Sequence, residues 1–362
     1  MKKQIALAMG LAVISGSAFA SKARLQALGE STDGSQYISD NRNIFLNAAH
    51  VNYHKDMVTF EAGDQSNTDA TATPNAEGGF LKANNNMVYG LYFGADAGRN
   101  DGTRTALTNP MNVWDAFVGG DAGVQWGVGV TYGSYNDEQQ ANEEEASLLR
   151  TRLGVISGDI EGFANITLTD TQSTDGTSDF EMKSNYDLGV NYNQGDMTYL
   201  ARVMNWEAED GDKGDESIKY QGITVGAARL QKFNNMATMN YKLTYNTSTQ
   251  EGTNYTDTAE EKNMSLNAVI GLEVQVKEWL ALRASISQDI LNEEEDDNGD
   301  KIKNADATNV NAGASLVFGD LQIDGVIGNS QNGTTFGDDT ATGEGVIRTD
   351  ALMSRVSATY RF

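Results

Sequence analysis

Charged side chains that recur at every second position are the residues of this sequence best suited to chemistry. In an extended chain, alternate side chains point to the same face, so charges with this spacing share one polar surface. Guanidinium groups and carboxylates on the wall of a water-filled space create a transverse field that orients polar solutes. The candidates with this pattern are Arg150, Arg152, Arg202, Arg283, Arg355, Asp115, Asp187 and Glu61. We predict that they line an aqueous lumen, either as a constriction or as mixed charges that only solvate a wet wall.

Histidine chemistry is limited to His50 and His54, the only two histidines in the chain. A Ser-His-Asp arrangement on the later segments is therefore excluded, because it needs a histidine beside the nucleophile. A metal pair is conceivable, but the stretch lacks helical periodicity, so we interpret both histidines as ordinary polar residues. We expect no enzymatic activity, no metal site and no cofactor.

Runs of acidic residues are the third candidate feature. They are Glu143–Glu145, Glu209–Asp212 and Glu293–Asp300. The last run does not fit a calcium-binding loop, because Gly299 as sixth residue puts Ala305 at the twelfth position, where a glutamate is needed. We predict that the runs lie in external loops. There they gather cations, bind divalent ions that bridge lipopolysaccharide phosphates, or simply remain solvated.

The composition limits the class of protein that carries these charges. The chain has 362 residues, a formal net charge of −25 and no cysteine. This acidity argues against nucleic acid as a partner, because phosphate binding needs clustered Lys and Arg. The lack of cysteine excludes disulfides and thiol chemistry. After the first twenty residues, no apolar stretch approaches the ~18 residues of a membrane-spanning helix, which leaves a closed β-barrel as the membrane option.

The first twenty residues have the composition of a secretory signal peptide. Lys2 and Lys3 form a positive start, an apolar run follows from Ile5 to Ile14, and Ala18–Ala20 supplies small residues for cleavage. We therefore predict export with cleavage after Ala20.

Residues 57–362 alternate between apolar and polar side chains with a period of two. The last segment, 352–362, shows the alternation best, with Val356, Ala358, Tyr360 and Phe362 on one face. The same pattern recurs at 126–132, 186–192, 237–246, 265–276, 280–286 and 310–318. Half-buried strands have this period, so we predict an all-β fold, a transmembrane up-and-down antiparallel β-barrel.

The connections between these segments alternate between short and long, which is typical of outer-membrane barrels with tight periplasmic turns and longer external loops. Short turns are predicted near 84–86, 120–123, 157–159, 193–196, 234–235, 277–278 and 319–320. Long loops are predicted at about 64–77, 95–112, 136–145, 171–180, 208–216, 250–261, 291–305 and 332–349. Together they join about sixteen strands, and fourteen remain possible because 57–94 is poorly periodic. Sixteen strands enclose a water-filled lumen.

Aromatic residues cluster near the predicted strand ends and resemble two interfacial girdles. On the turn side they are Trp126, Trp279, Phe318, Tyr360 and Phe362, and on the loop side Tyr132, Tyr135, Trp206, Tyr220 and Tyr245. Residues 21–56 fit no strand pattern. We predict that they form a separate segment in the periplasm or inside the lumen, with a short helix that Gly29 ends.

The C-terminal residues Tyr360 and Phe362, with Val356 and Ala358, resemble the terminal strand of Gram-negative outer-membrane proteins. In those proteins, a final Phe preceded by alternating apolar residues is the signal for the barrel-assembly machinery. The resemblance implies location in the outer membrane.

The N-terminal segment resembles porin-type outer-membrane proteins of delta-proteobacteria and predatory relatives at Arg24–Gly29, Asp40–Asn43 and Asn47–Ala49. It is also similar to the hatch of the hydrophobic-compound (long-chain fatty acid) transporter family, in which an Asn-Pro-Ala motif precedes the first strand. Here Ala48 stands in place of that proline. The second resemblance implies a luminal plug.

These observations lead us to expect a porin-like channel for passive diffusion of small polar solutes, with mild cation selectivity. A hatch-bearing transporter of hydrophobic compounds and a closed barrel that serves as a surface scaffold are the alternatives. The expected partners are outer-membrane lipids and lipopolysaccharide, the barrel-assembly machinery, small polar solutes and two further copies in a homotrimer.

Overall fold

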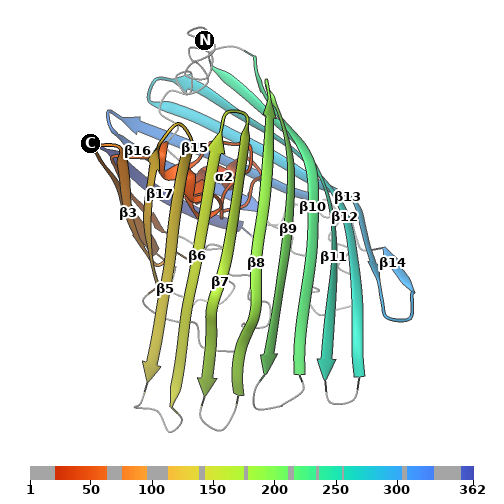
Figure 1. Ribbon diagram of the computed structural model, residues 1–362. Helices are drawn as coiled ribbons and strands as arrows, with labels where there is room; N and C mark the ends of the chain where they lie inside the picture. The colour runs from red at the N-terminus through yellow and green to blue at the C-terminus, as the bar shows by residue number, and fades with distance from the viewer. Residues whose placement is uncertain are drawn as a thin grey trace.

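A computed structural model shows one closed antiparallel sheet with the N-terminal segment inside it (Figure 1). The residues that the structure describes are 21–62, 76–95, 113–137, 143–174, 178–210, 216–233, 236–254, 257–303, 308–329 and 352–362. The predicted signal peptide and much of the predicted long loops lie outside these ranges. Within them, no helix has both the length and the apolar character needed to cross a membrane.

The sheet consists of strands with strict alternation of side chains, in agreement with the periodicity of the sequence. The strands are β1 (Met57–Ala62), β2 (Ala76–Asn84), β3 (Met87–Phe93), β4 (Trp114–Asp121), β5 (Gln125–Asp137), β6 (Glu144–Ser157), β7 (Ile160–Thr174), β8 (Ser178–Gln194), β9 (Met197–Asp210), β10 (Glu216–Lys232), β11 (Ala237–Asn254), β12 (Asp257–Lys277), β13 (Leu280–Glu295), β14 (Lys301–Lys303), β15 (Thr308–Phe318), β16 (Leu321–Asn329) and β17 (Leu352–Arg361).

Each strand pairs with its neighbour in sequence, and β1 pairs with β17 to close the barrel. The three-residue β14 pairs only with the end of β13, while β15 pairs with the main part of β13. Removing this short extension leaves sixteen barrel strands, which confirms the predicted fold and the higher of the two predicted counts. Closure removes the two edge strands that an open sheet would have.

The two ends of the barrel differ. At one end, here called the turn end, strands are joined by tight connections such as 158–159 and 319–320, and β1 and β17 carry the two ends of the barrel chain. The predicted loops at 171–180 and 250–261 are shorter than expected, because β7, β8, β11 and β12 continue through most of them. The expectation was wrong there because polar residues also extend strands where both faces meet water.

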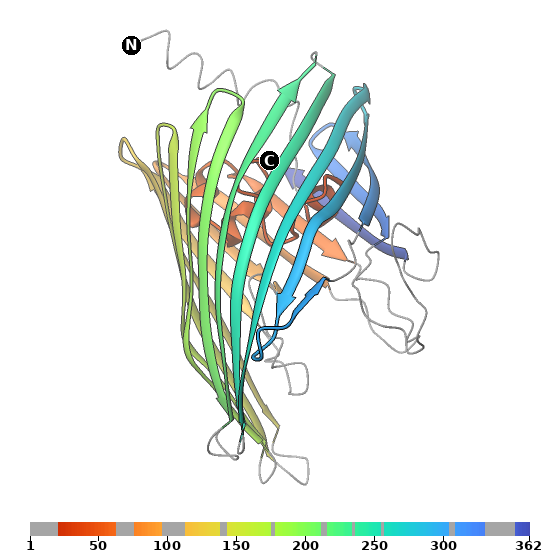
Figure 2. The same cartoon turned by 90° about the vertical axis from the view of Figure 1, so that its right-hand side faces the viewer.

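The wall is uneven in height (Figure 2). Strand β12 has 21 residues, whereas β1 has only 6. The long strands run from β5 to β13, and their ends opposite the turns, here called the loop end, extend beyond the shorter strands.

The outer and inner faces have opposite character. On β1, Val58 and Phe60 point outward with 44% and 54% of their surface exposed, whereas Thr59 and Glu61 point inward and are buried. The outward face of the other strands is likewise apolar, for example at Leu188, Ile223 and Ile270. Such an alternation places the apolar side chains of a barrel on its outer surface.

Three successive strand pairs are irregular at one level. The pairing of β6 with β7 shifts at Leu149/Arg150, and that of β8 with β9 shifts at Met182/Ser184. Between them, the ladder of β7 and β8 breaks off after Ile166 and resumes at Thr171. The outward side chain of Leu168 is 59% exposed at this interruption.

Candidate functional site

Residues 21–56, here called the plug, cross the lumen near the turn end (Figure 2). The plug consists of α2 (Lys22–Ala27) and two short 3-10 helices, η1 (Asn41–Phe45) and η2 (Ala48–Asn52). Side-chain caps begin all three: Ser21, Asp40 and Asn47 each accept a hydrogen bond from a backbone N–H of the helix that follows. The prediction of a short helix that ends before Gly29 is confirmed.

The plug is fixed to the wall around most of its circumference. Barrel partners of its hydrogen bonds and ion pairs come from β1, β2, β5, β6, β7, β8, β11 and β12. On the remaining side, Ala23 and Ala27 of α2 pack on Val326 of β16. Contacts that reach the wall in so many directions place the plug across the barrel.

Glycines on the inner face of the wall form the seat of η2. A Cβ atom on Gly127 would collide with the backbone of Ala48, and one on Gly154 would collide with the Asn47 side chain. Gly119 meets Val51 in the same way. Three neighbouring strands thus omit side chains where the backbone of the plug approaches closely.

Apolar side chains fill the space beside this seat. Ile44 and Phe45 of the plug belong to one buried cluster with Leu81, Tyr92 and Phe117 of the wall. The ring of Phe45 meets those of Tyr92 and Phe117 edge to face, with centroids 5.2 Å and 5.6 Å apart. Edge-to-face pairs of this kind add about 0.5–1.5 kcal/mol each to the burial itself.

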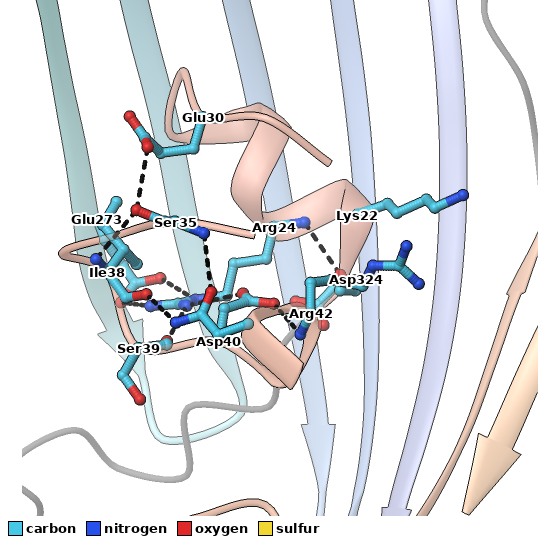
Figure 3. Close-up of polar contacts among 12 residues, drawn as sticks. Lys22, Arg24, Glu30, Ser35, Ile38, Ser39, Asp40, Arg42, Glu273 and Asp324 are labelled. Carbon is cyan, nitrogen blue, oxygen red and sulfur yellow. Dashed lines mark hydrogen bonds and ion pairs between the residues drawn. The ribbon is translucent and has the colours of Figure 1, made fainter. Parts of the chain in front are cut away.

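A buried charge network joins α2 to β12, β13 and β16 (Figure 3). The Arg24 Nε donates to Glu273 at 3.1 Å, and its Nη1 donates to Asp40 at 3.2 Å. Glu273 also accepts from Arg283, which in turn pairs with Asp324 at 3.0 Å. Burial raises the pKa of Asp40 to about 6, although Arg24 and the N–H of Arg42 favour its charged form.

A second network joins the plug to β1 and β2. The Arg42 guanidinium donates to Glu77 at 2.5 Å, and the Lys22 Nζ lies 3.0 Å from the same carboxylate. The backbone N–H of Lys22 donates to Glu61 at 2.9 Å. In this second network the plug supplies the cations and the wall supplies the carboxylates. Buried pairs of this kind are costly to break singly, because the remaining partner keeps an uncompensated charge.

The two histidines lie within the plug. The Nε2 of His50 is 3.0 Å from a Glu161 oxygen on β7. The His54 ring is buried, and burial together with nearby His50, Arg361 and Arg24 lowers its pKa well below 6.5. No group of three or more metal-binding side chains occurs in the described part of the chain.

Two of the predicted lumen-facing arginines contact the plug or its charge network. Arg152 is buried, donates to the Phe45 carbonyl at 3.0 Å and pairs with Asp115 at 2.6 Å. Arg283 links Glu273 to Asp324, as described above. Of the predicted acids, Asp115 thus meets an arginine, and Glu61 meets the plug backbone.

The other predicted residues lie away from these contacts. Arg202 makes a two-pronged pair with Asp187 at 2.6 Å and 2.9 Å. Arg150 is buried and donates to Thr167 at 3.1 Å, while Arg355 is half-buried on β17. The structure therefore joins four of the eight residues in two local pairs, Arg152 with Asp115 and Arg202 with Asp187.

Two expectations about position are wrong. Trp206 and Tyr220, predicted in the outer aromatic girdle, stack at 5.6 Å on the inner face, the same face on which Ala228 packs against the plug. The acids of 144–145, 209–210 and 293–295 belong to strand ends rather than loops. The acids were misplaced because the long strands reach beyond the level at which loops were expected to begin. Trp206 lies four residues after Arg202 on β9 and therefore shares the inward face predicted for Arg202.

Sequence reasoning missed most of the residues that hold the plug. They are Lys22, Arg24, Asp40, Arg42, Glu77, Glu161, Glu273, Asp324, Gly119, Gly127 and Gly154. The glycines carried a usable signal, because an isolated glycine within a strand pattern indicates close approach of another backbone. The acids carried none, since their partners are distant in sequence.

Comparison with known proteins gives only structural matches. No family model matches the chain, and no curated protein matches it. The toluene transporter TodX of P. putida shares 14% identity at a TM-score of 0.40, covering 95% of this chain and 99% of that one. A FadL homologue of Pseudomonas aeruginosa shares 10% sequence identity at a TM-score of 0.41, and the match covers 95% of this chain and 98% of that one. A porin shares 12% sequence identity at a TM-score of 0.40, and the match covers 84% of this chain and 99% of that one. Similarity at this level concerns the barrel fold and does not extend to function.

Proposed function

We propose that this chain is an exported outer-membrane channel for passive diffusion of small polar solutes, and that the plug controls passage through it. The observation that carries the proposal is the plug itself, which crosses the lumen of a closed sixteen-stranded barrel. The apolar outward face supports a membrane location, because exposed apolar surface of this extent needs lipid to cover it. The outer membrane follows from the terminal Phe362 and the predicted signal peptide.

The inner wall supports polar solutes. Toward the loop end, it carries amide and hydroxyl groups such as Asn246, Ser265 and Asn267. Arg152 and Arg202 pair with Asp115 and Asp187, which reduces the positive field of the wall. The acidic strand ends at the loop side then determine selectivity, which favours cations.

A hydrophobic-compound transporter is the second candidate, and two observations favour it. The broken ladder between Ile166 and Thr171 weakens the wall at one level. An apolar cluster with Phe180, Trp206 and Ala208 lies on the inner face at the loop end of the long strands. A blocked lumen, a weak point in the wall and an apolar inner surface are together what such a transporter needs.

A closed surface barrel that transports nothing is the third candidate.

In each case, we propose that lipids and lipopolysaccharide surround the barrel, that the assembly machinery inserts it through Phe362, and that it forms a homotrimer. Crosslinking of the intact membrane protein tests the last point.

A reversible lock on the plug tests the main proposal. Because the chain contains no cysteine, Ala27→Cys with Val326→Cys introduces the only two thiols, at positions of one buried plug–wall cluster. The plug is already joined to β1 by the chain, so a bond to β16 fixes its other side. Planar-bilayer conductance is then recorded for the oxidised protein and again after reduction.

We expect solute-sized conductance after reduction and its loss after oxidation, whereas each single-cysteine variant should be insensitive to both treatments. Equal conductance in the two states would mean that the plug does not control passage. No conductance in either state, combined with uptake of an apolar dye into the bilayer, would support the hydrophobic-compound transporter instead.

A further inference from the structure

The inner wall beside the closing strands is polar from the turn end toward the lumen. Where β1 and β17 pair, successive inward pairs are Met57 with Arg361, Thr59 with Thr359, and Glu61 with Ser357. Apart from Met57, every member of this stripe is polar. The plug faces the stripe with η1 and with Lys22 at the start of α2.

Several buried polar atoms at this place have no hydrogen-bond partner among the described residues. The hydroxyls of Tyr92 and Ser357 and both polar atoms of the Asn41 side chain are unpartnered. So are one oxygen of Glu61 and the Nη2 of Arg42. The five side chains are each at least nine-tenths buried.

These atoms belong to one region. Glu61 lies opposite Ser357 in the strand register, and side chains directly opposite on one face are neighbours. Arg42 and Asn41 are consecutive in η1, and Tyr92 packs its ring on Phe45 of the same helix. The group combines donors and acceptors, while the charges of Arg42 and Lys22 balance those of Glu61 and Glu77.

Other sectors of the plug are sealed in a different way. At β4 to β6, glycines let the backbone of η2 touch the wall directly. At β16, Ala23 and Ala27 pack on Val326, and Leu25 and Leu28 meet Ala228 of β10. The apolar contacts at β10 and β16 exclude water, whereas the η2 seat also holds one unpartnered polar atom each of Asn47 and His50.

We propose that a file of water molecules crosses the seated plug between η1 and the β1–β17 pair. Each unpartnered buried polar group costs about 1–3 kcal/mol, and bound water removes that cost. A neutral group of mixed donors and acceptors suits water better than an ion. The closed state of the channel would then pass water while it retains larger solutes. This inference rests on the proposed function, because it assumes a plugged membrane barrel.

Osmotic water permeability of proteoliposomes tests the inference. The protein carries the Ala27→Cys and Val326→Cys lock in its oxidised form, so the plug stays seated while shrinkage is followed by light scattering. We expect water permeability above that of protein-free vesicles. Ser357→Leu, which fills the polar stripe, should remove most of it, and Ser357→Val should remove part of it.

Ser134→Leu provides the matched control, because Ser134 is an exposed residue on the outward face of β5. Heat-modifiable migration confirms insertion of each variant, and Ser357→Val serves if the larger side chain prevents folding. Unchanged permeability in an inserted Ser357 variant would overturn the proposed path.

The two proposals fail differently. A locked barrel as tight to water as bare lipid, combined with conductance after reduction, would overturn the water path and leave the channel function standing. A barrel that conducts nothing in either state would instead contradict the channel function.

Discussion

Small residues decide how the plug meets the wall. Gly127 and Gly154 face Asn47–Ala49 so closely that any side chain there would displace the plug backbone. Ala48, which stands where the similar transporter hatch has proline, lies directly on this seat. The close packing therefore depends on the residues of two distant segments together.

Gly154→Ala should weaken plug seating and raise conductance, since inserting a methyl group into a packed site costs about 1–3 kcal/mol. Planar-bilayer recordings check this. Gly252→Ala is the control, because a Cβ at that position on β11 meets nothing within 4 Å. Equal conductance of the two variants would show that the glycine seat is not needed to close the barrel.

His54 makes plug seating sensitive to acid. Its pKa in the folded protein lies well below 6.5, so the unfolded chain binds a proton first as the pH falls below 6.5. The free energy of unfolding therefore decreases progressively as the pH falls below 6.5, because the folded protein keeps His54 neutral. His54→Asn should retain more protection of the plug from trypsin than the wild type between about pH 7 and about pH 5.

Asp40 acts in the opposite direction. Its pKa of about 6 lies above the ordinary 3.8, so protonation below about pH 6 favours the folded form. Asp40→Asn mimics the protonated side chain and should remove this gain on acidification. Identical pH profiles of the wild type, His54→Asn and Asp40→Asn would contradict both assignments.

Strand β12 illustrates how one element separates lipid from the lumen. Ile270 is 43% exposed on the outward face, whereas Asn267 faces inward and donates to Asp289 at 2.8 Å. Ile270→Arg should destabilise the inserted barrel by roughly 2–4 kcal/mol if this position lies near mid-bilayer. Asn267→Arg should be nearly neutral, because it stays beside water and a carboxylate. Urea titration of the refolded protein measures the free energy of unfolding of each variant. An equal loss in both variants would mean that the strand register is wrong.

Strand β17 closes the barrel, and Phe362, which directly follows it, contacts the end of the plug. The N–H of Phe362 donates to the Asp56 carbonyl at 3.1 Å, and Lys82 lies 4.7 Å from the centre of its ring. Removing Phe362 should strongly reduce insertion into the outer membrane while export continues. Fractionation and heat-modifiable migration measure this, and normal levels of inserted protein after the deletion would refute the assembly role.

At the scale of the whole molecule, the distribution of charge predicts selectivity. Three arginines of the wall, Arg152, Arg202 and Arg283, are paired with acids, whereas the chain as a whole carries −25. We predict mild cation selectivity of the open channel, stronger at low salt because screening acts over about 8–10 Å at physiological ionic strength. Neutralising the acids of 293–300 should weaken it.

The reversal potential in a salt gradient measures this selectivity. Neutralising the acids of 293–300 should reduce cation selectivity only moderately, because two of them are already paired. Lys303 lies 3.5 Å from Glu293, and Lys301 lies 3.3 Å from Glu295. Anion preference at low salt would mean that wall arginines control a narrow constriction after all.

The sequence by itself determined the barrel. Alternation with a period of two separated Ile270 from Asn267 and Val58 from Thr59, because a strand turns successive side chains to opposite faces regardless of what surrounds it. Turn residues then marked the tight connections and indicated about sixteen strands, and the closed sheet decided between sixteen and fourteen.

Only the tertiary structure decided what fills the barrel. Arg24 meets Glu273 across 249 positions of sequence, and Asn47 meets Gly154 across 154 − 47 = 107 positions. Such contacts leave no periodic signal in the sequence, because the plug is irregular. The inward side chains of the wall would alternate in the same way if no plug were present. The wall therefore could be predicted from the sequence, whereas the plug seat and the charge networks required the closed barrel.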